Sequence, residues 1–216
     1  MSHRAMSLTD SRSFTAPGLR TFGRLFLAGF IGLLIWELWA RVLTRAVLGY
    51  PLEPAGLIDA IAQHRFGLSV PYLLREALHY GVGIVGYPVA YLAISRFLPR
   101  WQDVLDAIVL VTFTAGVGWL VAAGAFKPIH FVFYTAVLGL IATRFINRDP
   151  LIADAIVWGN FTWFNALGLM APVGGLSFYL LGEGGELSYM SFVGHVIYGA
   201  VAVWLFERWD AAAGRR

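Results

Sequence analysis

The sequence contains no cysteine, little charge and almost no lysine. Without cysteine the chain forms no disulfide and offers no thiolate for metal binding, iron–sulfur clusters or nucleophilic catalysis. Only 13% of the 216 residues are charged, whereas 58% are apolar. Of the 16 basic residues all but Lys127 are arginines. They stand at the ends of apolar runs, which is typical of membrane anchors and not of a nucleic-acid-binding surface.

The apolar residues are gathered in six runs, and a bilayer core needs about 20 such residues per helix. We therefore predict an all-α, polytopic membrane bundle over residues 22–209, preceded by a disordered tail (1–21) and followed by a short tail (210–216). The expected spans are 22–48, 70–97, 104–125, 129–146, 151–170 and 187–206. We expect a kink at Pro88. A short amphipathic helix near 53–63 should lie at the membrane interface. No length remains for a soluble catalytic domain, so we expect no catalytic residues.

An even number of spans puts both termini on the same side of the membrane. With the termini inside, 11 of the 16 basic residues are inside as well, which favours cytoplasmic termini. The first external loop departs from this pattern, because it carries Arg41, Arg45, Arg65 and Arg75.

Polar residues at membrane depth are costly and therefore mark candidate sites. Glu37 and Arg41 stand four residues apart in the first span and share a helix face, either as a functional pair or as a structural pair near the outer surface. Glu76 and His79 form one Glu-x-x-His motif in the second span. Dinuclear metal sites need two such motifs, so we expect no metal site.

Asn160 and Asn165 in the fifth span and His195 in the sixth are the other candidates. Each either lines a polar cavity or holds helices together by hydrogen bonds. We measure depth from the cytoplasmic end of each helix at about 1.5 Å per residue. By this measure Asn160, Asn165 and His195 lie in the same layer as Glu37 and His79, between the middle and the outer half of the bilayer. We expect no cofactor. The one alternative is a haem between His79 and His195, which lie at similar depth.

Three stretches resemble a group of small bacterial inner-membrane proteins of unknown function, the YagU-like group. They are the first span with Gly29–Leu33 and Glu37–Ala40, the helix from Leu78–Tyr80 to Arg96–Pro99, and Gly194–Gly199. The resemblance implies a multi-pass protein of the bacterial inner membrane and no known activity. It covers about a fifth of the chain and includes Glu37, His79 and His195.

Two functions fit these observations. In the first, the protein transports or conducts protons or a small solute through the polar layer. Glu37 and His79 would exchange protons, and His195, Asn160 and Asn165 would line the cavity. In the second, it is a non-catalytic accessory or assembly subunit of a larger respiratory or photosynthetic complex. Its expected partners are the lipid bilayer, other membrane subunits or itself, and no nucleic acid.

Overall fold

The computed structural model describes residues 17–147 and 149–214, and this part of the chain is helical and contains no strand. The predicted all-α class is therefore confirmed. Five helices are long and apolar enough to cross a membrane. They are Leu19–Leu48, Tyr72–Phe97, Trp101–Ala122, Pro128–Ile146 and Glu186–Gly214.

Two of these five helices are interrupted by a π-helical turn, in which the backbone hydrogen bonds skip one residue further than in an α-helix. The first consists of α1 (Leu19–Glu37), η1 (Leu38–Leu43) and α2 (Thr44–Leu48). The second consists of α4 (Tyr72–Gly81), η2 (Val82–Gly86) and α5 (Tyr87–Phe97). The turn η2 ends just before Pro88, which has no backbone N–H to donate, so the interruption lies beside the residue where the sequence predicts a kink.

The remaining spanning helices are α6 (Trp101–Ala122), α7 (Pro128–Ile146) and α10 (Glu186–Gly214). The short α3 (Gly56–Phe66) lies between α2 and α4, and η4 (Phe178–Glu183) is a 3₁₀ segment before α10. The predicted short helix near 53–63 thus begins at Gly56 and ends at Phe66, and the next residue, Gly67, caps it with a positive φ of 65°.

The fifth predicted span is also helical, but it lies inside the protein. It runs through α8 (Pro150–Trp163), η3 (Phe164–Met170) and α9 (Ala171–Val173), and it begins where the Asp149 side chain accepts a hydrogen bond from Leu151 N at 2.9 Å. It is not among the five helices that are long and apolar enough to cross a membrane. Most of α8 is buried between other helices, so it tolerates more polar residues than a lipid-exposed helix. The count of six spans stays a prediction.

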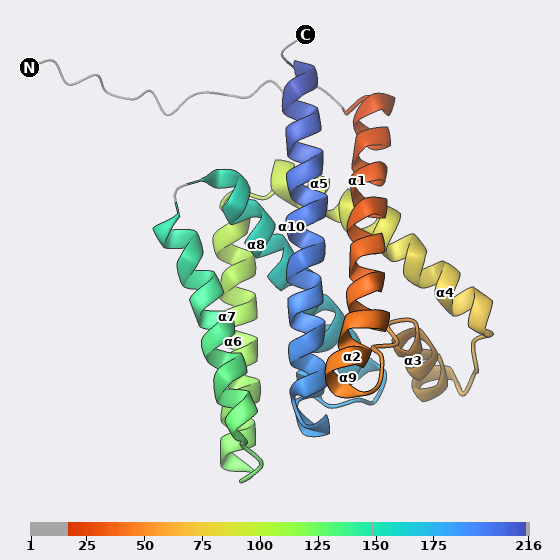
Figure 1. Ribbon diagram of the computed structural model, residues 1–216, viewed down its shortest axis with the longest axis vertical. Coiled ribbons are helices and arrows are strands. Elements are labelled where there is room, and N and C mark those ends of the chain that lie inside the picture. The colour runs from red at the N-terminus through yellow and green to blue at the C-terminus, as the bar shows by residue number, and fades with distance from the viewer. Residues whose placement is uncertain (1–16, 148, 215–216) are drawn as a thin grey trace, which may run out of the picture.

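Figure 1 shows the helices running alternately up and down: α1 down, α4–α5 up, α6 down, α7 up, α8 down and α10 up. The first residues of α1 and the last residues of α10 therefore lie at the same end of the bundle, here called the terminal end. Which side of a membrane this end faces stays a prediction. The prediction of a cytoplasmic terminal end counts 11 basic residues on that side. Five of them lie outside the described residues, namely Arg4, Arg12, Arg148, Arg215 and Arg216.

Two predicted boundaries need correction. The first helix begins at Leu19, inside the predicted tail, of which residues 1–16 lie outside the described part. The last helix continues to Gly214, so residues 210–214 are helical and not a tail. Two causes extend it: the alanines at 211–213 are strong helix formers, and Asp210 forms ion pairs with Arg24 at 3.3 Å and Arg96 at 3.4 Å.

The centre of the bundle is the crossing of α8 and α10. There Gly159 and Gly199 face each other, and a Cβ atom on either glycine would approach the other helix backbone to 2.7 Å or less. Only glycine permits this approach. The crossing fixes the position of α10 and therefore of His195, which it carries.

Candidate functional site

Four of the predicted site residues form one connected cluster between α1–η1 and α4. Arg41 Nε lies 2.5 Å from Glu37 Oε2, and Arg41 Nη2 lies 2.6 Å from Glu76 Oε2. His79 Nε2 lies 2.8 Å from Glu37 Oε1. Glu37 is only 9% exposed and stands in the middle of the chain of contacts. The structure thus brings together the two pairs that the sequence predicts separately.

The charges of this cluster leave room for one proton. Glu37 and Glu76 contribute two negative charges and Arg41 one positive charge, so the cluster carries one net negative charge when His79 is neutral. Protonation of His79 makes it neutral. Net charge at membrane depth is costly. The cost of burying this net charge is therefore lowest with a proton on His79.

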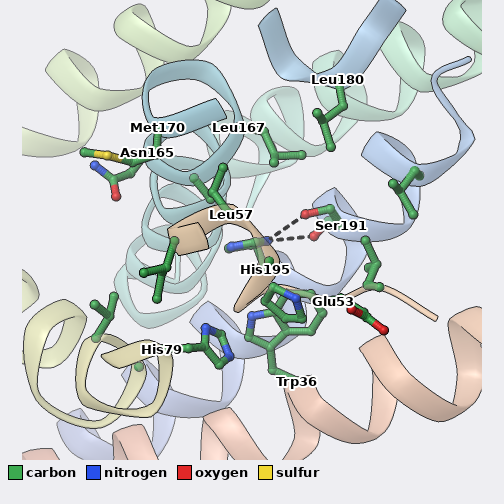
Figure 2. Close-up of a pocket in the computed structure, with 18 of the residues that line it drawn as sticks. Trp36, Glu53, Leu57, His79, Asn165, Leu167, Met170, Leu180, Ser191 and His195 are labelled. Atoms are coloured by element: carbon green, nitrogen blue, oxygen red, sulfur yellow. Dashed lines mark hydrogen bonds between the residues drawn. The ribbon is translucent and has the colours of Figure 1, made fainter. Parts of the chain in front are cut away.

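A cavity of about 560 Å³ lies beside this cluster. Its wall comes from α1, α3, α4, η2, α5, η3, η4 and α10 and is mostly apolar, with Leu33, Trp36 and Leu57 among the lining residues. Three predicted site residues line it, namely His79, Asn165 and His195 (Figure 2). The cavity has the size and composition of a small-molecule site.

Two π-helical segments contribute directly to this wall. Val82 and Gly83 come from η2, and Asn165 comes from η3. The third, η1, begins directly after Glu37. Such turns rotate the residues that follow them relative to a regular α-helix and are frequent at functional sites. Their position here is one reason why side chains from three helices face the same space.

His195 is 4% exposed and held in a defined orientation. Its Nδ1 lies 2.8 Å from the Ser191 carbonyl oxygen, and its ring contacts Trp36 with centroids 5.1 Å apart. Because a carbonyl oxygen only accepts, Nδ1 carries the proton and donates it. In Figure 2 the bonds to Ser191 leave from one ring nitrogen, and the other nitrogen points away from Ser191.

The two candidate asparagines differ. Asn165 Oδ1 accepts a hydrogen bond from the Tyr87 hydroxyl at 3.1 Å, and its side chain lines the cavity. Asn160 is 0% exposed and is absent from the cavity wall, so its predicted place there is corrected. Its amide makes no hydrogen bond within the described residues, so it does not hold helices together that way either, and nothing in the structure explains it.

A second polar cluster, near the terminal end, was missed at the level of sequence. The Tyr91 hydroxyl donates to Glu207 Oε1 at 2.9 Å and also lies 3.4 Å from Asp154 Oδ2. Asp154 also accepts a hydrogen bond from the Gln102 side chain. No local spacing in the sequence points to this cluster, because Tyr91 and Glu207 are 116 residues apart.

One further histidine differs from expectation. The position of His130 next to Pro128 predicts an interfacial residue, but His130 is 1% exposed. Its Nδ1 accepts a hydrogen bond from the Lys127 backbone N–H at 3.0 Å, at the start of α7. It does not line the cavity. His130 is therefore a buried capping residue, and it serves below as a control for His195.

A haem between His79 and His195 stays a prediction. The two histidines line the same cavity, but His79 Nε2 already contacts Glu37, and His195 offers only Nε2. Haem ligation would have to break the contact of His79 with Glu37 or use its Nδ1. Within residues 17–147 and 149–214 no group of three or more acidic or histidine side chains is arranged to hold a metal ion.

Comparison with known proteins adds no family. No family model, no curated protein and no solved structure matches the chain. The resemblance to the YagU-like group therefore stays a prediction.

Proposed function

We propose that this membrane protein conducts protons through its helix bundle, with Glu37 and His79 as the exchanging groups. The supporting observation is the contact of 2.8 Å between His79 Nε2 and Glu37 Oε1 beside a cavity that also contains His195. A carboxylate paired with an imidazole shares a proton readily. Water in the cavity would exchange this proton with the pair.

The helix α4–α5 supplies the rest of the route. It carries His79 and Tyr87 at the cavity and Tyr91 one turn further on, where the Tyr91 hydroxyl contacts Glu207 and Asp154. His79 and Tyr91 are 12 residues apart, which corresponds to about 18 Å along a helix. That distance is more than half of a hydrocarbon core about 30 Å thick. Water in the cavity would connect His79 to the Tyr87 hydroxyl, since both border the same space.

The route would join the two ends of the bundle. Arg41 belongs to η1, directly before α2, which lies at the end away from the termini (Figure 1), and Glu207 belongs to the last third of α10, which ends at the terminal end. The proposed setting is a bacterial inner membrane with the terminal end in the cytoplasm. In this orientation the described terminal-end arginines follow the positive-inside pattern.

The test is proton uptake by proteoliposomes that contain a pH-sensitive dye and carry an imposed membrane potential. Glu37→Gln and His79→Gln keep hydrogen-bonding capacity but lose proton exchange, so each should reduce uptake roughly tenfold or more. Glu186→Gln removes an exposed carboxylate outside the cluster and should leave uptake unchanged. Full uptake by folded Glu37→Gln and His79→Gln proteins would refute the proposal.

A further inference from the structure

The cavity has no fixed positive charge on its wall. Its lining contains neither lysine nor arginine within the described residues, and its two carboxylates, Glu53 and Glu183, are on exposed residues. A negatively charged guest would find no lysine or arginine there and would be repelled by these carboxylates. The cavity therefore selects against anions.

One acceptor on this wall has no partner. His195 donates from Nδ1 to the Ser191 carbonyl, which leaves Nε2 as an unprotonated acceptor. No hydrogen bond to Nε2 is formed by any residue that the structure describes, although His195 is 4% exposed and lines the cavity. A guest that donates a hydrogen bond to Nε2 would form it inside a mostly apolar cavity, where such a bond is stronger than in water.

We propose that the cavity binds a small, largely apolar molecule with one uncharged hydroxyl group, and that this hydroxyl donates to His195 Nε2. The apolar part of the guest would contact Leu33, Leu57 and Met170. This inference goes beyond proton conduction and does not depend on it.

Three probes with one apolar body test the head-group chemistry: 4-pentylphenol, 4-pentylanisole and 4-pentylbenzoate. Binding to the protein in nanodiscs is measured by titration calorimetry, with empty nanodiscs as the blank for lipid partitioning. The phenol should bind about five- to tenfold more tightly than the anisole, which cannot donate, and the benzoate should bind most weakly. In His195→Phe the phenol should lose this advantage, whereas the anisole should bind as before.

Two further variants complete the test. His130→Phe replaces a histidine that is equally buried but absent from the cavity wall, so the ratio of phenol to anisole affinity should be unchanged. Leu57→Trp places a larger side chain into the cavity from α3 and should weaken binding of all probes. It decides the location of the site even if His195→Phe does not fold.

Three results would overturn the proposal. They are equal affinity of the wild-type protein for phenol and anisole, a phenol advantage that persists in folded His195→Phe, and absence of binding of any probe. None of them bears on proton uptake by the Glu37 and His79 variants, so the two proposals fail separately.

Discussion

Replacing Gly199 by alanine should destabilise the protein because it forces α8 and α10 apart. A Cβ atom at this position would lie 2.5 Å from Gly159 Cα and 3.0 Å from the Ala155 carbonyl oxygen. Carbon atoms in contact prefer about 3.5–4.0 Å, so the helices must separate by about 1 Å. Both obstructing groups belong to the backbone, and neither can rotate away as a side chain would.

The expected net cost is about 2 kcal/mol. Overpacking in a close-packed interior costs about 1–3 kcal/mol, and this contact belongs at the upper end of that range. Alanine regains up to about 1 kcal/mol of helix propensity over glycine. Gly118→Ala is the matched control, because nothing lies within 4 Å of a Cβ atom there, so it should be neutral or stabilising by up to about 1 kcal/mol.

The assay is reversible unfolding of the three proteins in the same micelles, followed by helical circular dichroism. We expect Gly118→Ala to be the most stable of the three proteins, the wild type to be intermediate and Gly199→Ala to be the least stable. Equal stability of the Gly199→Ala and Gly118→Ala proteins would refute the close approach of α8 and α10. It would also remove the support for the position of His195.

Two other predictions follow. Tyr198→Phe deletes the buried hydrogen bond of 2.7 Å from the Tyr198 hydroxyl to the Gly83 carbonyl oxygen, so it should lower the free energy of unfolding by about 1–2 kcal/mol. Tyr134→Phe deletes an exposed hydrogen bond to Thr114 and should change the free energy of unfolding by less than about 0.5 kcal/mol. Equal effects of the two variants in the same unfolding assay would contradict the burial argument. A pull-down of the tagged protein in mild detergent should give a colourless monomer or small homo-oligomer, whereas a multi-subunit assembly would favour the accessory-subunit alternative and a Soret band would favour the haem.

Local sequence rules predict the helices and one ion pair of the site. Apolar runs of about 20 residues indicate the spans. Four-residue spacing puts Glu37 and Arg41 on one face, and they do form an ion pair. Depth along each helix suggested that Glu37 and His79 lie at one level, and they are in contact. These predictions succeed because they depend on distance along a single helix.

Contacts between helices could not be predicted in the same way. Depth gives the height of a residue but not the direction in which its side chain points, so Asn160 was placed in the cavity although it lies in the helix interface. The π-helical turns change the direction of the side chains further, and no residue pattern in the sequence predicted these turns. Tyr91 and Glu207 meet across 116 residues of sequence, which no local spacing reveals.

The central claim is that protons pass through the cavity. Because the chain has no native cysteine, a single introduced thiol can be labelled to test this claim. In the Ser191→Cys variant a thiol replaces a hydroxyl on the cavity wall, and in Ser188→Cys it replaces a buried hydroxyl on the same helix that does not line the cavity. Proteoliposomes are treated with a small thiol-reactive reagent, and proton uptake is compared with the extent of labelling. The account predicts that Ser191→Cys is labelled and loses uptake, while Ser188→Cys is not labelled and keeps it. Undiminished uptake by fully labelled Ser191→Cys protein would contradict the account.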